Sequence, residues 1–236
     1  HGLLLTGIQS HAEPRSCPRL ERRATACLPA RARVVYRVSV ANYVPKDAGY
    51  RAARQAGDRS RAALKLAEIN RRFRLLRAGM RVVDLGCWPG GWLQIASAAV
   101  GPSGVVVGVD LEAVADLGLA NVRTLVGDVR RTETIDLVLE QLGGPADVVL
   151  SDLAPKLTGV RDVDRARQLA LCERALELCA KVLSSGGPCL IKLFSDSERE
   201  AASLLRTRFP SVSAYRPGTT RKGSSEIYCL CTDHRA

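Results

Sequence analysis

From about residue 46 onward, the chain alternates between two patterns of apolar and polar positions. One pattern is a short run that is almost wholly apolar, which is typical of a strand buried on both faces of a sheet. The other is a longer stretch in which apolar residues recur every three or four positions. In residues 58–73, for example, Ala62, Leu66 and Ile69 share one face of a predicted helix. Strands that alternate with helices predict an α/β domain.

The predicted elements can be placed by their residue ranges. The strands lie within residues 81–86, 104–110, 121–129, 146–155, 188–194, 212–217 and 225–231. The helices lie within residues 58–73, 92–100, about 162–183 and 197–209. Because no helix separates the last two strands, we expect them to form an antiparallel hairpin at one edge of the sheet. The predicted fold is therefore a Rossmann-like, seven-stranded and mostly parallel sheet with helices on both faces.

Residues 1–45 do not follow this alternation. They include HAEPRSCPRLERRATACLPARAR, a segment rich in Arg, Ala and Pro without clear periodicity. We expect residues 1–45 to form a poorly ordered extension and residues 46–236 to form the folded domain. Organellar transit peptides share this Arg-rich, acid-poor character. We therefore expect a cytoplasmic protein, or an organellar one if the segment is a transit signal.

Charge and hydropathy narrow the range of partners. Lysine and arginine outnumber aspartate and glutamate by 35 to 24, and the resulting net charge of +11 favours a polyanionic partner such as nucleic acid. An Arg-rich proteome would give the same charge, so charge alone leaves the partner open. No run of about 18 apolar residues is present, so we expect no membrane span.

The histidines and cysteines exclude several kinds of catalysis. His1, His11 and His234 are the three histidines, so we expect no Ser–His or Cys–His pair and no histidine metal site in the core. The eight cysteines are scattered without a C-x-x-C pair, which favours free thiols, and we predict no bound metal. Cys229 and Cys231 are expected on one face of a strand. Proton transfer then falls to Lys, Asp, Glu, Cys or Tyr.

The segment VVDLGCWPGGW (82–92) predicts a strand, a glycine-rich loop and the start of a helix, which bring backbone N–H groups close to a nucleotide. Trp88 occupies the place of the second glycine of a dinucleotide-binding loop, so NAD is disfavoured. No G-K-[ST] follows, which excludes a P-loop. An adenosine ligand without a pyrophosphate remains. The loop residues expected to line it are Gly86, Pro89, Gly90, Gly91 and Trp92.

Carboxylates at three successive strand ends suit the same ligand. Asp110 ends the second strand, where its side chain can accept hydrogen bonds from both ribose hydroxyls. Asp128 ends the third strand, within reach of an adenine amino group, and Asp84 would lie near a positively charged amino-acid portion. Any one of them could be a turn or cap residue. Together they favour S-adenosylmethionine as the cofactor.

Two further polar residues suggest chemistry beside this cofactor. Asp152 in SDLAP ends the fourth strand, near the switch point where α/β sheets bind ligands. Lys192 lies in the otherwise apolar LIKLF, where its charge is costly to bury unless a carboxylate compensates. The alternative is a lysine that extends from a strand end into solvent. Asp152 would lie on the adjacent strand, which favours a functional pair.

These motifs occur in an order and spacing that resemble a known family. VVDLGCWPGGW, SDLAP, IKLF and SSEIYCL, preceded by RSRAALKL, resemble the FtsJ/RrmJ family of RNA ribose 2′-O-methyltransferases from about Asp47 to Cys231. The resemblance implies an S-adenosylmethionine-dependent methyltransferase fold without a metal. It implies a catalytic tetrad formed by Lys65, Asp152, Lys192 and Glu226. It also implies cofactor contacts at Gly90, Trp92, Asp110 and Asp128. Cys87 and Trp88 depart from the two small residues of close relatives, which puts the packing of the loop in question.

The chemistry of ribose methylation agrees with such a tetrad. Displacement at a sulfonium methyl group by a ribose hydroxyl needs alignment, removal of a proton and stabilisation of the developing oxyanion. We expect Lys192 to act as the general base, with Asp152 orienting Lys192 and the methyl group. Lys65 would position the hydroxyl, and Glu226 would pair with Lys65.

Basic residues flank two members of the tetrad, and we expect them to hold RNA phosphates. They are Arg51, Arg54, Arg59, Arg61, Arg221 and Lys222. A solvated charged face is the alternative explanation. A 2′-hydroxyl nucleophile requires RNA rather than DNA. Aromatic residues make up only 4% of the chain, so recognition should depend on shape and phosphates, as in a ribosomal particle.

Four functions were compared. The first is methylation of a uridine in large-subunit rRNA, by a monomer that acts on the large ribosomal subunit. The second applies the same tetrad to the ribose of a tRNA anticodon loop or a cap, and the lack of a large added domain favours rRNA over it. The third is a catalytically silent RNA-binding assembly factor, which the complete tetrad disfavours. The fourth, an NAD-dependent oxidoreductase, is disfavoured by Trp88.

Overall fold

The computed structural model describes residues 60–235 of the chain. The predicted extension, residues 1–45, lies outside the described residues, and so do Arg51, Arg54 and Arg59. The domain boundary near residue 45 and the proposed role of these three arginines therefore stay predictions.

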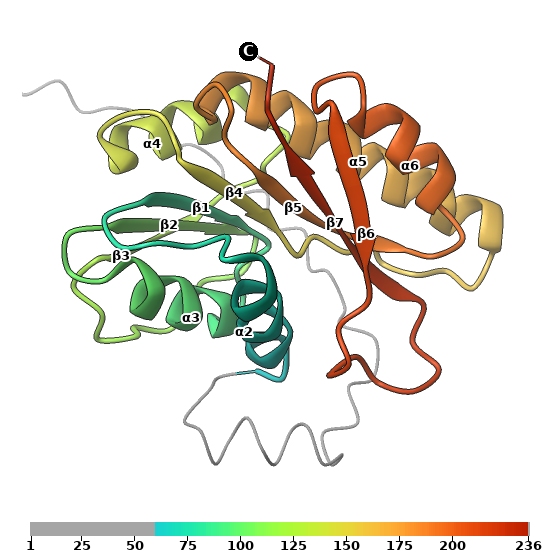
Figure 1. Ribbon diagram of the computed structural model, residues 1–236, viewed down its shortest axis with the longest axis horizontal. Coiled ribbons are helices and arrows are strands. Elements are labelled where there is room, and N and C mark those ends of the chain that lie inside the picture. The colour runs from blue at the N-terminus through green and yellow to red at the C-terminus, as the bar shows by residue number, and fades with distance from the viewer. Residues whose placement is uncertain (1–59, 236) are drawn as a thin grey trace, which may run out of the picture. The chain divides into compact units, whose positions relative to one another are not determined.

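The described residues form one seven-stranded sheet in the order β3-β2-β1-β4-β5-β7-β6 (Figure 1). The strands are β1 (Arg81–Leu85), β2 (Val105–Asp110), β3 (Val122–Val126), β4 (Val148–Ser151), β5 (Cys189–Phe194), β6 (Ser211–Tyr215) and β7 (Glu226–Thr232). Neighbouring strands are parallel except around β7, which is antiparallel to both β5 and β6. The predicted seven-stranded fold and the antiparallel pairing of the last two strands are confirmed. β7 lies inside the sheet, however, so that β6 alone forms the edge.

The helices cover both faces of the sheet. They are α2 (Ala62–Phe73), α3 (Gly91–Val100), α4 (Thr132–Leu142), α5 (Arg161–Val182) and α6 (Glu198–Leu205). Figure 1 shows α2 and α3 on one face and α4, α5 and α6 on the other, and each group packs on its own apolar cluster. The sequence analysis did not predict α4. In α2 the buried face includes Ala63 where Ala62 was expected, beside Leu66 and Ile69.

The order of the strands places their carboxyl ends where a ligand can bind. The chain runs outward from β1 through β2 to β3 and then returns to the other side of β1 to form β4. Such a reversal leaves a crevice beyond the carboxyl ends of the two central strands, because the connecting helices leave on opposite faces. The glycine loop follows β1, and Asp152 follows β4, so both lie at this edge.

A single glycine in β2 allows the loop after β1 to lie close to its neighbour. A Cβ atom added at Gly108 would lie 2.8 Å from the Cys87 Sγ atom, which is closer than real Cβ contacts. The amides of Gly86 and Cys87 both donate to the Val109 carbonyl, at 2.9 and 3.3 Å. The loop is therefore fixed against the end of β2, and Cys87 fills the space that Gly108 leaves.

Candidate active site

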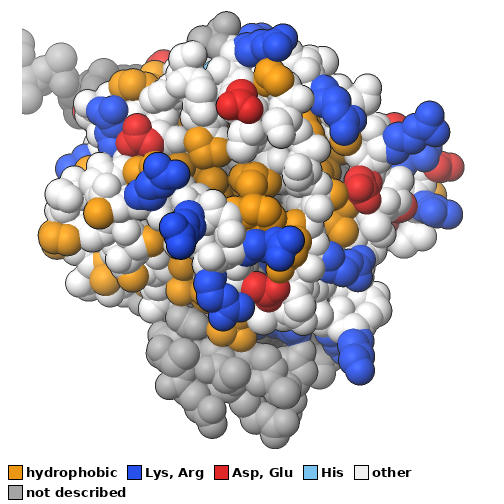
Figure 2. Space-filling view, viewed as in Figure 1, with side chains coloured by type: hydrophobic (Ala, Val, Ile, Leu, Met, Phe, Trp, Pro, Cys, Tyr) orange, Lys and Arg blue, Asp and Glu red, His pale blue; other side chains and the backbone are white. Residues whose placement is uncertain are grey.

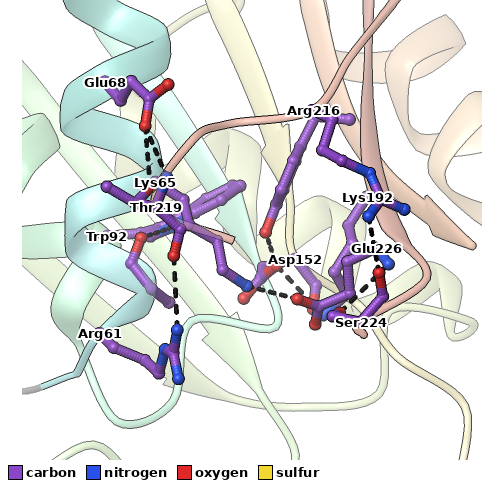
Figure 3. Close-up of polar contacts among 12 residues, drawn as sticks. Arg61, Lys65, Glu68, Trp92, Asp152, Lys192, Arg216, Thr219, Ser224 and Glu226 are labelled. Atoms are coloured by element: carbon purple, nitrogen blue, oxygen red, sulfur yellow. Dashed lines mark hydrogen bonds and ion pairs between the residues drawn. The ribbon is translucent and has the colours of Figure 1, made fainter. Parts of the chain in front are cut away.

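Two lysine–carboxylate pairs lie side by side at the carboxyl edge of the sheet (Figure 3). The Lys65 Nζ atom is 2.6 Å from the Glu226 Oε2 atom. The Lys192 Nζ atom is 3.1 Å from the Asp152 Oδ1 atom and donates a hydrogen bond of 2.6 Å to the Asp152 carbonyl oxygen. The fold thus brings together all four residues that the sequence analysis had named as a tetrad.

The four residues come from four elements, and strand register explains how two of them meet. Lys192 of β5 is paired with Tyr228 of β7, so their side chains point to the same face of the sheet. Glu226 lies two residues before Tyr228 and shares that face. α2 packs on the same face and carries Lys65 on its buried side. Lys65 and Lys192 are each only 6% exposed, which makes their carboxylate partners necessary.

Tyr228 is a member of the site that the sequence analysis missed. Its hydroxyl group donates a hydrogen bond of 3.2 Å to the Asp152 Oδ1 atom. Burial, together with the charges of Asp152 and Glu226, raises the pKa of Tyr228 well above its usual value, so the phenol remains a donor. Its ring packs 5.8 Å from the Trp92 ring, between centroids, and the Lys65 Nζ atom is 5.8 Å from its centroid. Its position two residues after Glu226, on an alternating strand, was the signal available in the sequence.

The balance of charge keeps Glu226 ionised. Burial alone would raise the pKa of this carboxyl group, but the charge and hydrogen bond of Lys65 and the charge of Lys192 outweigh burial and lower it. Each of the two lysine side chains therefore faces one carboxyl group of the site. A site of this kind can hold a hydroxyl group and move its proton without stabilising a large excess of either charge.

Glu68, one helical turn after Lys65, ties the loop between β6 and β7 to α2. Its carboxylate accepts hydrogen bonds from the Tyr215 hydroxyl at 2.8 Å, the Gly218 amide at 2.8 Å, and the Thr219 amide and hydroxyl at 3.0 and 2.9 Å. Burial would raise the pKa of Glu68, yet these donors lower it to about 2. The sequence analysis did not name Glu68. Its contacts hold the segment that leads into Glu226.

The carboxylates predicted to bind an adenosine also reach this edge. Asp110 ends β2 and accepts hydrogen bonds from the amides of Trp88 and Glu112, at 2.9 and 3.0 Å. Asp128, just after β3, forms an ion pair with Arg130 at 2.5 Å, and hydrogen bonds from Arg130 lower its pKa. The Trp92 indole N–H donates to the Ala62 carbonyl at 2.8 Å, so it joins the start of α2 to α3.

Asp84 and the glycine loop fit S-adenosylmethionine, which is positively charged. The Asp84 side chain is fully buried, and neither of its oxygens has a hydrogen-bond partner among the described residues. Burial raises its pKa well above the usual value, and the carboxylates of Asp152 and Asp110 add to this effect. Gly86 and Gly90 have φ angles of +79° and +110°, which favour glycine and leave no Cβ at the loop. A nearby cation with N–H donors would complement this group of acids.

Three of the predicted RNA contacts lie within the described part of the chain, on α2 or next to it and on the loop before β7. The Arg61 side chain donates a hydrogen bond of 3.4 Å to the Thr219 carbonyl, and Arg221 and Lys222 are exposed on the loop between β6 and β7. Within residues 60–235, no group of three or more His, Cys, Asp or Glu side chains is arranged to hold a metal ion. None of the helices between Ala62 and Leu205 is long and apolar enough to cross a membrane.

The sheet order, the antiparallel strand inserted before the edge and the acidic ligand site beyond β1 and β2 define the class of Rossmann-like methyltransferases. A family model described as FtsJ-like methyltransferase matches residues 59–234. The chain belongs to this family, as its motifs suggested.

Curated relatives and a solved structure agree with the family. The chain is 45% identical over 186 residues to a protein from Methanothrix thermoacetophila named Ribosomal RNA large subunit methyltransferase E, covering 78% of this chain and 71% of that protein. It is 40% identical to a protein of the same name from Methanothermobacter thermautotrophicus, over 80% of this chain and 90% of that one. A crystal structure of a ribosomal RNA methyltransferase from Plasmodium falciparum has a TM-score of 0.66 at 23% identity. It covers 75% of this chain and 98% of that one, and it supports the fold alone.

Proposed function

We propose that the protein transfers a methyl group from S-adenosylmethionine to the 2′-hydroxyl of a ribose, at a uridine of large-subunit (23S) rRNA. The observation that carries the proposal is the pair of buried lysine–carboxylate contacts at the carboxyl edge of the sheet. The names of the relatives support rRNA as the substrate. The protein would act as a cytoplasmic monomer on the large ribosomal subunit.

The cofactor would lie along the glycine loop and the three acids at the carboxyl ends of the first three strands. Asp110 has lone pairs available for ribose hydroxyls beyond its two backbone contacts, and Asp84 would face the charged amino-acid portion. When bound, the cofactor supplies an electrophilic methyl group on a sulfonium. Further contacts of the loop are proposed for Gly86, Pro89, Gly90, Gly91 and Trp92, and Asp128 would meet the adenine.

The tetrad would supply the positions and the proton transfer. Asp152 holds the Lys192 amine through its carboxylate and its carbonyl, so the amine has a fixed direction. In its neutral form Lys192 would take the proton of the 2′-hydroxyl as the oxygen bonds to the methyl carbon and the carbon–sulfur bond of the sulfonium breaks, which leaves S-adenosylhomocysteine. Lys65, held by Glu226, positions the hydroxyl and stabilises the negative charge that develops on its oxygen.

The test is transfer of labelled methyl from S-adenosylmethionine to isolated large subunits, naked rRNA and total tRNA. Wild type is compared with Lys192→Ala and with Lys181→Ala, a control at an exposed lysine of α5. We expect label on the large subunit at one alkali-resistant linkage, lost only in Lys192→Ala. Isothermal titration with S-adenosylmethionine checks that Lys192→Ala still binds the cofactor.

Other outcomes would replace the proposal. Label on tRNA alone would assign the enzyme to the tRNA anticodon loop instead. Cofactor binding without label on any RNA would favour a catalytically silent assembly factor. Full activity of Lys192→Ala would remove Lys192 from the role of general base.

A further inference from the structure

Three arginines at the end of α2 line a hollow separate from the catalytic residues. The hollow has a volume of about 540 Å³ and is lined by Asn70, Arg71, Arg74, Leu76 and Arg77. Figure 2, in the orientation of Figure 1, shows Lys and Arg side chains distributed around an apolar area on this side of the molecule. Between Asn70 and Arg77 the only other charged residue is Arg72, which is also positive.

No carboxylate among residues 60–235 forms an ion pair with the arginines of this hollow. None of Arg71, Arg74 and Arg77 forms an ion pair or side-chain hydrogen bond with another residue of the range 60–235. Glu68 is one helical turn away from Arg71, but both of its oxygens are already occupied by Tyr215 and the loop beyond it. Three cations that share one concave surface repel one another, so the surface favours an anion with several charges.

Hydrogen bonds hold the backbone of the turn from which the arginines extend. The Arg74 amide donates a hydrogen bond of 2.8 Å to the Asn70 carbonyl, and the Leu76 amide donates one of 2.8 Å to the Asn70 side chain. Arg74 is the helix C-cap and has a left-handed backbone, with φ 51° and ψ 43°, where glycine is the usual residue. Glycine would fit this turn with less strain, so the presence of arginine suggests that its side chain has a role.

We propose that the arginine hollow binds backbone phosphates of the substrate RNA, a few nucleotides away from the ribose that is methylated. The inference rests on the proposed function, in which the substrate is RNA. At 1.5 Å per residue, Arg71 and Arg74 lie about 9 Å and about 14 Å from Lys65 along the axis of α2. α2 thus carries both Lys65 of the proposed tetrad and Arg71, and the segment directly after the helix carries Arg74 and Arg77. Guanidinium groups bind phosphate oxygens in pairs and read no base sequence.

The test combines RNA binding with kinetics. A variant with Arg71→Ala, Arg74→Gly and Arg77→Ala is compared with wild type on the RNA or subunit that wild type methylates. We expect the KM for RNA to rise about tenfold or more while kcat at saturating RNA stays within about twofold. The slope of log K against log salt should fall by about 2 to 3, because each lost phosphate contact removes about 0.7 to 0.9.

A matched variant distinguishes the loss of the hollow from a general loss of three positive charges. Arg199→Ala, Arg206→Ala and Arg208→Ala remove the same charge from exposed positions in and just after α6, on the other face of the sheet. Equal losses in the two variants, or unchanged RNA affinity in the first, would overturn the inference. Arg74→Gly alone suits the left-handed turn, so we expect an equal or higher Tm with weaker RNA binding, which unfolding cannot explain.

The same data distinguish failure of the proposed function. If wild type binds RNA in a salt-dependent way but transfers no methyl group, the proposed function is overturned. The RNA affinities of the two arginine variants still test the arginine hollow in that case. If wild type binds no RNA, both proposals fall.

Discussion

In the Lys65–Glu226 pair, the stability of each buried charge depends on the other. The two side chains are 8% and 27% exposed, so neither ion is fully hydrated, and each offsets the cost of burying the other. For this reason, replacing one partner should lower the free energy of unfolding more than breaking a typical exposed ion pair does.

Replacing Glu226 by Gln tests this pair. We expect Glu226→Gln to lower the free energy of unfolding by ~1–3 kcal/mol, because a mostly buried Lys65 ammonium loses its counter-ion. Methyl transfer should fall about 10- to 100-fold. Urea unfolding and initial rates measure the two effects. Glu173→Gln, at an exposed position of α5, is the control, and equal behaviour of the two variants would contradict the role of the pair.

Gly86 offers a test of crowding at the loop. A Cβ atom there would lie 3.1 Å from the Leu153 amide and 3.3 Å from the Asp152 carbonyl carbon, on a backbone with φ +79°. Gly86→Ala should therefore displace the segment that carries Asp152 and lower both cofactor affinity and kcat. Gly101→Ala is matched, because its φ is +66° and nothing lies within 4 Å of the added atom. If the two variants lose activity equally, strain and not crowding is responsible.

At the scale of elements, the contacts of Glu68 join α2 to the loop before β7. The folded-state pKa of Glu68, about 2, lies below its ordinary value of 4.5. Glu68 thus stabilises the fold above about pH 4.5, and this contribution is lost as the pH falls toward 2. We expect wild type to be more stable than Glu68→Gln at pH 6 and the difference to shrink toward pH 2. Chemical unfolding at several pH values measures it, and a difference independent of pH would contradict the contacts.

The pattern of apolar residues predicted β1, β2, β4, β5 and β7 well, because these mostly buried strands carry a strong and continuous signal. It did not predict α4. That helix mixes buried Ile135, Val138 and Leu142 with Leu137, which is 47% exposed, so its apolar positions do not form one clean stripe. The place of β7 between β5 and β6 is set by pairing between distant segments, and no local pattern records it.

The site was predictable where its residues break a pattern. Lys192 stands out in an apolar strand, and Asp152 follows another, so each was visible, and the family motifs supplied Lys65 and Glu226. Tyr228 and Glu68 do not break the local pattern, because tyrosine is common in strands and glutamate is common in helices. Their importance comes from partners 76 and 147 or more positions away, which only the folded chain brings together.

At the scale of the whole molecule, the described cysteines belong to the core. Cys87, Cys172, Cys179, Cys189, Cys229 and Cys231 are buried free thiols. Cys229 and Cys231 pack into the same cluster, as expected for one face of a strand. Burial raises the pKa of Cys172 and of Cys229 to about 12, so thiolate is scarce at neutral pH.

These thiols report on folding. In the native protein we expect iodoacetamide to leave all six unmodified for as long as the sheet remains intact, because they are buried. In urea above the unfolding midpoint all six should react. Peptide mass spectrometry assigns each site. Rapid labelling of Cys229 or Cys231 without urea would contradict the packing of β7.

The position of β7 has a consequence for how the protein is made. During synthesis β6 leaves the ribosome before the strand that must hold it, and β5 presents an open edge until Glu226–Thr232 has been added. An open edge can pair with strands of other chains. The same late strand delivers Glu226 to Lys65 across 161 positions. A nascent chain therefore has no complete tetrad until its sheet is closed, and the step that protects the edge from aggregation is also the step that completes the proposed catalytic site.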